Sequence, residues 1–299
     1  MRPLFQPPEW SLPTLESSSG CFETMRAYGG RIFRLSAHLD RLYASATYMG
    51  LTIPEPPEPF GRRLMQALRK ARLQEAVVRV ALIPEKAMES SRFEVRSSKF
   101  KRLSLHSAFR IPHSAFRVAR PSIAVVPAQA PPPELYRRGL QVVVVPTRKF
   151  PVSQIDPQAK FSARLGSVMA LLDGQLRRAD EILFLDGPGY VTESTASNFG
   201  IIVRGEFVAA PCWMGLLAGI TWQGLIEVAS ALNIPVRETP LTRHDVYNAD
   251  EAFMSSTLKE IIAVTQIDGR RIGNGKPGPV VARLHRSFQA LVRRELRLK

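Results

Sequence analysis

The first third of the chain alternates between extended and helical patterns of apolar residues. β-Branched and aromatic side chains flank Gly29-Gly30, which is typical of two strands joined by a tight turn. After Ser36, a suitable helix N-cap, apolar residues recur at helical spacing. The expected elements are two strands within 20–35, helices over 36–51 and 59–73, and a strand over 77–84. This order predicts an α+β unit in the first 85 residues.

The second half of the chain repeats this alternation after a proline-rich stretch. The stretch AQAPPPEL follows a short strand at 122–127 and is a stiff connector of the kind that joins domains. The elements expected beyond it are a strand over 140–147, a helix over 163–179, hairpins over 181–194 and 198–211, a helix over 220–234, strands over 251–257 and 263–272, and a helix from about Gly278. We therefore predict an α+β protein with a small N-terminal α/β domain over 1–127, a linker over 128–137 and a larger α+β domain over 138–299.

Residues 92–120 follow neither pattern. The pentapeptide HSAFR occurs twice in this segment, at 106–110 and at 113–117. Two copies of a seven-residue period are too few for a solenoid, because each repeat unit needs several neighbours to bury a core. We therefore expect an inserted basic loop within the N-terminal domain.

Composition places the chain among ordinary globular proteins. Its 299 residues are enough for two modest domains, and 45% hydrophobic with 22% charged residues excludes a disordered composition. The sequence contains neither an apolar run of membrane-spanning length nor a signal peptide pattern at its start. Its two cysteines, Cys21 and Cys212, form no disulfide framework and no CxxC metal or redox motif. We expect a cytoplasmic protein without a metal site or a membrane partner.

The net charge of +15 raises the possibility of a nucleic-acid partner, so its distribution matters. Residues 92–120 carry eight Lys or Arg against one Glu, and residues 283–299 carry six against one Glu. These two segments hold most of the excess charge, so the rest of the protein is nearly balanced. Neither segment interleaves basic and aromatic residues as a single-strand binding groove does. We interpret both as solvated faces or loops, and keep an anion- or nucleic-acid-binding protein on a degenerate enzyme scaffold as the non-enzyme alternative.

Six short motifs follow one another along the chain. They are HLDRL at 38–42, a lysine at 160 ahead of a helix, YVTESTASNFGIIV at 190–203, GIT at 219–221, NADEAFMSST at 248–257 and IDGRRIGNGKPGP at 267–279. In this order and spacing they resemble the class IV aminotransferases, a family of branched-chain aminotransferases, D-amino-acid aminotransferases and aminodeoxychorismate lyases. The resemblance covers most of 20–85 and 140–285 but not 92–120. It implies a pyridoxal 5′-phosphate enzyme with the cofactor in the cleft between the two domains.

The resemblance assigns the two ends of the cofactor ring. Pyridoxal phosphate needs an amine that forms an imine, a carboxylate opposite the ring nitrogen and a cradle for the phosphate. Lys160, which alone would be one of 41 basic residues, is implied as the Schiff-base lysine and as the group that moves the proton between Cα and C4′. That role requires a depressed pKa. Glu193 is implied as the partner of the protonated ring nitrogen.

The remaining cofactor-binding residues are expected to hold the phosphate. Gly219 precedes a helix whose N-terminus can bind an anion, and Arg41 would reach across from the small domain with a bidentate guanidinium. The full expected cofactor-binding set is Arg41, Lys160, Glu193, Ser197, Asn198, Gly219, Ile220, Thr221, Ser256 and Thr257. The strand with Phe22, Glu23 and Arg26 would line the substrate side, although ordinary strand pairing also explains it. We expect His38 to be a packed helix residue.

The sequence departs from two branches of this family. Branched-chain enzymes commonly have a tyrosine five residues after the lysine, where this chain has Leu165. The Arg-x-His pair of D-amino-acid enzymes does not follow the strand at 77–84. The motifs at 248–257 and 267–279 look closest to amino-acid transaminases, so we place transamination ahead of the lyase reaction.

We therefore expect ping-pong transfer of an amino group between an amino acid, of the branched-chain type, and a 2-oxo acid such as 2-oxoglutarate. An aminodeoxychorismate lyase and a D-amino-acid aminotransferase remain alternatives. A nucleotide-binding P-loop is not supported, because GNGKPGP has Pro277 where that motif requires Ser or Thr. By resemblance the protein would be a homodimer, and we do not expect nucleic acid among its partners.

Overall fold

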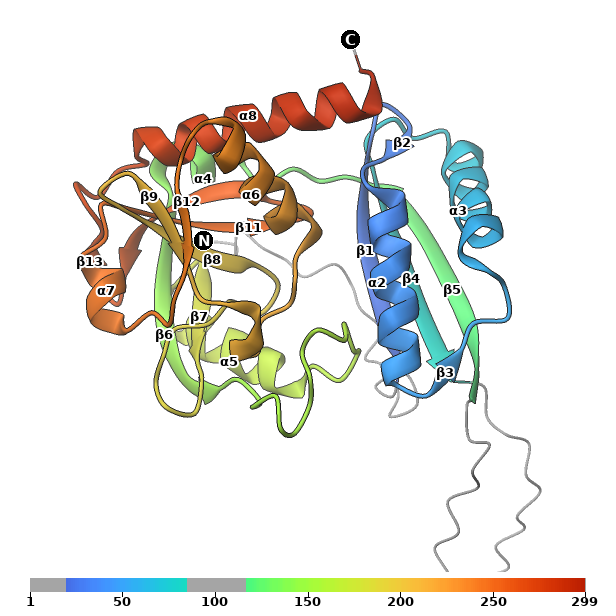
Figure 1. Cartoon of the computed structure of the whole chain (residues 1–299), viewed down its shortest axis with the longest axis horizontal. Coiled ribbons are helices and arrows are strands. Elements are labelled where there is room, and N and C mark those ends of the chain that lie inside the picture. Colours follow the sequence, from blue (N-terminus) through green and yellow to red (C-terminus); the bar gives the residue numbers. More distant parts are fainter. Residues whose placement is uncertain (1–19, 85–116, 299) are drawn as a thin grey trace, which may run out of the picture.

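The computed structural model describes residues 20–84 and 117–298, which form two β-sheets with helices packed on them. Figure 1 shows the two sheets side by side, with the C-terminal helix running across the edge of the molecule from one toward the other. The mixed α+β fold class that the sequence predicts is confirmed. The cavity described below lies between α2, which packs on the first sheet, and elements of the second.

The first sheet has the strand order β2-β1-β4-β5-β3. Its pairs are antiparallel except for the last, in which β3 runs parallel to β5. Helices α2 and α3 cover one face, and their apolar sides form a shared core with the strands. The elements are β1 (Cys21–Tyr28), β2 (Arg31–Ile32), α2 (Leu35–Tyr48), β3 (Leu51–Thr52), α3 (Pro57–Ala71), β4 (Ala76–Pro84) and β5 (Arg117–Pro127).

The second sheet is larger and has the order β10-β9-β8-β11-β12-β6-β7, with the short β13 on β12. Helices α6 and α8 pack together over one apolar core, and α4 and α7 border a second core. Its strands are β6 (Leu140–Arg148), β7 (Glu181–Leu185), β8 (Asn198–Val203), β9 (Glu206–Ala209), β10 (Val236–Glu238), β11 (Glu251–Ser256), β12 (Glu260–Ile267) and β13 (Arg270–Arg271). Its helices are α4 (Pro133–Arg138), α5 (Leu165–Leu176), α6 (Ile220–Ala231), α7 (Arg243–Tyr247) and α8 (Pro279–Leu296), with the 3-10 turn η1 (Cys212–Met214).

Three element boundaries differ from the sequence prediction. Strand β5 begins at Arg117, so the last four residues of the predicted insert belong to the sheet, where Arg120 pairs with Ile83. The rest of that insert and almost all of both HSAFR copies lie outside the described residues. Helix α2 begins at Leu35 after Arg34, whose left-handed backbone takes the N-cap position expected for Ser36. Helix α4 occupies part of the predicted proline-rich linker.

The predicted hairpin over 181–194 is present only in part. Strand β7 pairs in parallel with β6, while the returning arm forms a single bridge between Val191 and Leu185. The N–H of Thr192 donates to the carbonyl of Phe184, and the N–H of Phe184 donates to the carbonyl of Glu193. The chain then leaves the sheet. The carboxylate of Glu193 therefore sits at the point where the polypeptide turns away from the sheet edge.

Strand β1 links the two halves of the molecule. Its buried side chains alternate, so Glu23 and Met25 face the helices of the first sheet while Phe22 and Arg26 face the opposite way. Arg26 Nη1 donates to the carbonyl of Leu258 at 3.3 Å, and this contact ties β1 to the β11–β12 turn. The loop that carries Lys160 lies along the same strand and brings the lysine between the sheets.

The basic C-terminal segment forms the exposed face of α8. Its apolar side chains, including Leu284, Phe288 and Leu291, are buried against the second sheet. The arginines at 283, 286, 293, 294 and 297 are exposed. This arrangement is an amphipathic helix with a solvated basic face.

Candidate active site

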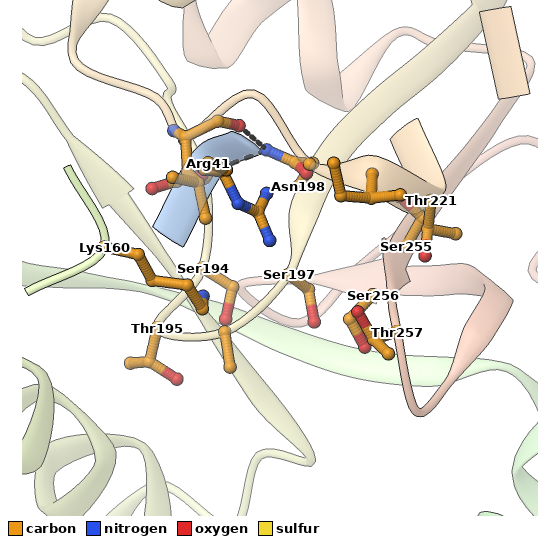
Figure 2. Close-up of a pocket in the computed structure, with 15 residues that line it drawn as sticks. Arg41, Lys160, Ser194, Thr195, Ser197, Asn198, Thr221, Ser255, Ser256 and Thr257 are labelled. Atoms are coloured by element: carbon orange, nitrogen blue, oxygen red, sulfur yellow. Dashed lines mark hydrogen bonds between the residues drawn. The ribbon is translucent and has the colours of Figure 1, made fainter. Parts of the chain in front are cut away.

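One cavity lies between α2 of the first sheet and elements of the second sheet. Figure 2 shows its walls, which come from α2, the loop before α5, the segment after β7, the start of α6 and the end of β11. All ten residues of the expected cofactor-binding set line it: Arg41, Lys160, Glu193, Ser197, Asn198, Gly219, Ile220, Thr221, Ser256 and Thr257. The three expected substrate residues, Phe22, Glu23 and Arg26, are absent from this lining.

Lys160 is held in the cavity by its own backbone. Its N–H donates to Ser45 Oγ at 3.0 Å, and its carbonyl accepts the N–H of Phe22 at 3.0 Å. Burial, helped by the positive charges of Arg41 and Arg164, lowers the pKa of the Lys160 amine to about 8, although nearby carboxylates oppose this shift. A lysine with this pKa is an effective nucleophile near neutral pH, because a sizeable fraction of it is uncharged.

Glu193 presents a fixed carboxylate to the same cavity. Its Oε1 accepts a hydrogen bond from Lys149 Nζ at 2.6 Å, and its Oε2 accepts from Asn198 Nδ2 at 3.0 Å and Leu217 N at 3.2 Å. These donors hold the carboxylate in one orientation. The cavity therefore offers an amine and a carboxylate that could bind two different groups of one ring-shaped ligand.

Another part of the cavity wall is suited to an anion. Gly219 caps the N-terminus of α6, where free backbone N–H groups favour negative charge. A Cβ atom at Gly219 would lie 2.2 Å from Asn198 Oδ1, so only glycine fits this close approach. Ser194 Oγ and Ser255 Oγ are buried in the lining and have no hydrogen-bond partner among the described residues. Two unsatisfied hydroxyl groups in one cavity indicate that it accepts a polar ligand.

Arg41 reaches this wall from α2. Its Nη1 donates to the carbonyl of Ala218 at 2.7 Å, directly before Gly219. Its Nε and Nη2 donate to Glu23, at 2.6 and 3.0 Å. The guanidinium is thereby anchored on both sides of the boundary between the sheets.

Glu23 differs from its predicted place on the substrate side. It is fully buried on the face of β1 opposite Phe22, because successive side chains of a strand point to opposite faces. His38 Nδ1 contacts the same carboxylate at 2.8 Å, and burial keeps the pKa of that histidine below its usual value. Burial alone would raise the pKa of Glu23, but the hydrogen bond from His38 and the charge of Arg41 outweigh it and hold the pKa at about 2.

The other two residues expected on the substrate side take separate positions. The Phe22 ring lies beside Lys160, with the lysine Nζ 4.9 Å from the ring centroid. Arg26 pairs with Glu260 at 3.3 Å and lies away from the cavity lining. Of the three expected substrate residues, Phe22 is therefore the one that adjoins the reactive lysine.

Two cations near the cavity were not identified from the sequence. Lys149 follows β6 and pairs with Glu193, a contact between residues 44 positions apart. Arg164 precedes α5, donates to the carbonyl of Thr195 and lies over Phe22, 5.7 Å from the ring centroid. The one sequence signal for Arg164 was a cation four residues after the lysine, at the start of a helix.

The described residues include no group of three His, Cys, Asp or Glu side chains that could hold a metal ion. None of their helices is long and apolar enough to cross a membrane. Both cysteines are unpaired, and burial raises the pKa of the Cys21 thiol to about 12. Among the described residues, the candidate active site is therefore the polar cavity around Lys160.

Comparisons with known proteins agree with this geometry. A family model described as amino-transferase class IV matches residues 20–267. A branched-chain-amino-acid aminotransferase of Pseudomonas aeruginosa is 31% identical over 284 residues, which cover 93% of this chain and 86% of the relative. A D-alanine aminotransferase of Listeria monocytogenes is 31% identical over 271 residues, which cover 90% and 85%. The crystal structure of a T.th. branched-chain amino acid aminotransferase with pyridoxamine 5′-phosphate is similar with a TM-score of 0.79, at 27% identity over 96% of this chain and 91% of that one.

Proposed function

The chain belongs to the class IV aminotransferase family, and we propose that it exchanges amino groups between an amino acid of the branched-chain type and a 2-oxo acid. The enzyme depends on pyridoxal 5′-phosphate, and 2-oxoglutarate is the proposed amino acceptor. One observation carries the assignment of residues: Lys160 and Glu193 line the same cavity, whose remaining wall is an anion cradle. In this proposal Lys160 binds the cofactor aldehyde and Glu193 binds the ring nitrogen.

The cavity fits the cofactor on its own chemistry. The start of α6, Arg41 and the hydroxyl groups of Ser256 and Thr257 would hold the phosphate. The two unpartnered serine hydroxyl groups described above offer donors that no described residue uses. When bound, pyridoxal phosphate supplies an electron sink that stabilises negative charge on the substrate Cα.

The protein side chains bind, orient and move protons around that centre. Lys160 Nζ, with its pKa of about 8, accepts the proton from the substrate Cα and delivers it to C4′ of the cofactor. Glu193 keeps a proton at the ring nitrogen, and Asn198 and Lys149 keep Glu193 in place. The Phe22 ring shields one side of the lysine from water. In the ping-pong cycle the amino acid leaves as a 2-oxo acid before the second oxo acid is aminated.

The choice of substrate rests on the relatives. Their names include branched-chain and D-alanine aminotransferases at equal identity. The branched-chain reading is favoured because the similar solved structures carry that name. A D-amino-acid preference is the second candidate, and the D-alanine aminotransferase relative is what supports it.

We further propose a homodimer, a cytoplasmic location and the division into domains over 1–127 and 138–299. Support for the dimer comes from an exposed apolar stripe on α5, defined as Leu165, Val168, Met169, Leu172 and Leu176. These residues recur at helical spacing, and Leu176 is 85% exposed. A contiguous exposed apolar surface of this kind is typical of protein interfaces. Helix α5 begins just after Lys160, so an interface there would place two active sites near it.

The test of the assignment uses Lys160→Ala and the wild-type protein. Wild-type protein should show the visible absorbance of a bound imine, lose it on borohydride reduction, and carry the reduced cofactor on Lys160 in peptide mass spectra. A panel of L- and D-amino acids, followed by each half-reaction separately, then identifies the donor. Normal turnover by Lys160→Ala would refute the proposal. Release of pyruvate from aminodeoxychorismate without transamination would replace it with the lyase reaction.

A further inference from the structure

Lys160 and Arg164 share one aromatic ring. The amine of Lys160 lies 4.9 Å from the centroid of Phe22, and the guanidinium carbon of Arg164 lies 5.7 Å from the same centroid. The two cations are close enough that Arg164 lowers the pKa of the lysine. Whatever chemistry takes place at Lys160 therefore occurs beside a second positive charge.

Arg164 is a cation whose direct hydrogen-bond partner is a neutral group. Its Nη2 donates to the carbonyl of Thr195. Within residues 20–84 and 117–298, no carboxylate lies within ion-pair distance of its guanidinium, and Glu193 and Glu181 act on it only from farther away. Burial also lowers the pKa of Arg164, which reflects the cost of removing its charge from water. A guanidinium held in this way is suited to an incoming oxyanion.

The position of Thr195 indicates which oxyanion that is. Figure 2 shows Thr195 at one end of the site, near Lys160, and Thr221, Ser256 and Thr257 at the other end. In pyridoxal phosphate the aldehyde carbon lies between a phenolic oxygen and the carbon that carries the phosphate arm. With the aldehyde at Lys160 and the phosphate at the far cradle, the phenolic oxygen faces the end lined by Thr195, whose carbonyl accepts a hydrogen bond from Arg164.

We propose that Arg164 binds the phenolate oxygen of pyridoxal phosphate. This inference rests on the proposed cofactor site at Lys160. The adjacent residue, Leu165, cannot donate a hydrogen bond to that oxygen, because its side chain is apolar and 76% exposed on α5. The backbone of Arg164 is the N-cap of α5, and its side chain is held by the carbonyl of Thr195 and the ring of Phe22.

The experiment compares two aldehydes, pyridoxal 5′-phosphate and its 3-deoxy analogue, which lacks the phenolic oxygen. Dissociation constants are measured by fluorescence for wild-type protein, Arg164→Met and the charge-preserving Arg164→Lys. Loss of a hydrogen bond to a charged group should weaken binding of pyridoxal phosphate to Arg164→Met about tenfold. Binding of the 3-deoxy analogue should stay the same in all three proteins. Arg164→Lys should keep part of the preference for the phenolic aldehyde.

Other outcomes would overturn the inference. Equal weakening for both aldehydes would make Arg164 a structural residue of the α5 N-terminus. Unchanged aldehyde binding with a raised KM for the amino acid would assign Arg164 to the substrate carboxylate instead. If Arg164→Met does not fold, Arg164→Lys provides the test. A preference for pyridoxal phosphate over the 3-deoxy analogue that is smaller than in wild-type protein supports the inference. A preference as large as in wild-type protein refutes a geometric role for the guanidinium. Wild-type protein that binds neither aldehyde at Lys160 would refute the cofactor site itself, and this inference with it.

Discussion

The carboxylate of Glu23 accepts two hydrogen bonds from the guanidinium of Arg41, at 2.6 and 3.0 Å, on the buried face of β1. His38 holds the other side of that carboxylate, and Arg41 in turn holds the carbonyl of Ala218 beside the anion cradle. A fully buried residue outside the cavity therefore sets the position of a guanidinium inside it. Glu23 is a positioning residue in this arrangement.

Glu23→Gln should weaken binding of pyridoxal phosphate about tenfold, because Arg41 loses a charge-assisted partner and gains freedom. The measurement is a fluorescence titration with pyridoxal phosphate and, in parallel, with pyridoxal, which lacks the phosphate. The loss should be confined to the phosphorylated aldehyde. Glu58→Gln is the matched control, because Glu58 is 90% exposed on α3 and its ion pair is with Arg62 on the same helix. Equal losses for both aldehydes would contradict a role directed at the phosphate.

Glu23 should also contribute to stability in a defined pH range. The pKa of its carboxyl is about 2 in the folded protein against an ordinary value of 4.5, so the folded state prefers the ionised form. The contribution is present above pH 4.5 and is lost as pH falls from 4.5 toward about 2. Urea midpoints of wild-type protein and Glu23→Gln should therefore differ most above pH 4.5 and converge below it. A constant difference down to pH 3 would show that the ionised carboxylate is not what stabilises the fold.

Imine formation at Lys160 should titrate well below the range of an ordinary lysine. The pKa of about 8 makes the free amine the major form above that pH, whereas an unperturbed lysine would require about 10.5. The rate at which apoenzyme forms the visible chromophore with pyridoxal, followed by stopped flow, should rise with pH and level off above about 8 to 9. A rate that continues to climb through pH 10 would mean that burial does not depress this pKa.

Gly219→Ala should disturb both the cradle and the ring-nitrogen partner. The added methyl group would lie 2.2 Å from Asn198 Oδ1, and Asn198 is a donor to Glu193. We expect destabilisation of about 1–3 kcal/mol from overpacking, together with weaker cofactor binding. Gly187→Ala is the control, because no atom of the described residues lies within 4 Å of its added Cβ. Thermal unfolding and a cofactor titration measure the two effects, and equal behaviour of both variants would contradict the clash.

A charge on the apolar stripe of α5 should dissociate the proposed dimer. Leu172→Glu places a carboxylate at a position that is 48% exposed in the single chain and would be buried in the dimer. Light scattering should give the dimer mass for wild-type protein and the monomer mass for this variant. Val126→Glu makes the same change on an exposed valine of β5 and should leave the mass unchanged. An active wild-type monomer would remove the basis for the dimer.

The sequence was most informative where function is encoded in local strings. Lys160, Glu193 and the Gly219–Thr221 segment each belong to a short motif, and the structure brings these residues to one cavity. Lys149 and Arg164 were missed because their partners are set by tertiary contacts that periodicity does not encode. The contact between Lys149 and Glu193, for example, forms only after the loop following β6 folds back on the segment after β7.

Glu23 and β5 illustrate two different limits. The sequence prediction placed Phe22 and Glu23 together on the substrate side, whereas the alternation of β1 puts them on opposite faces. A carboxylate on an apolar face, however, is read as exposed unless its partners are known, and His38 and Arg41 come from α2. The start of β5 was read as part of a basic loop because Arg117 and Arg120 are charged, yet their backbone pairs with neighbouring strands.

The two backbone hydrogen bonds between β1 and the lysine loop, from Phe22 N to Lys160 O and from Ser162 N to Gly20 O, attach the reactive amine to the smaller sheet. Apart from Arg41, the residues of the anion cradle belong to elements of the larger sheet. Any rotation of one sheet against the other would therefore pull on the two ends of a bound cofactor. The absorbance of the bound cofactor should consequently change when the two halves of the molecule move relative to each other.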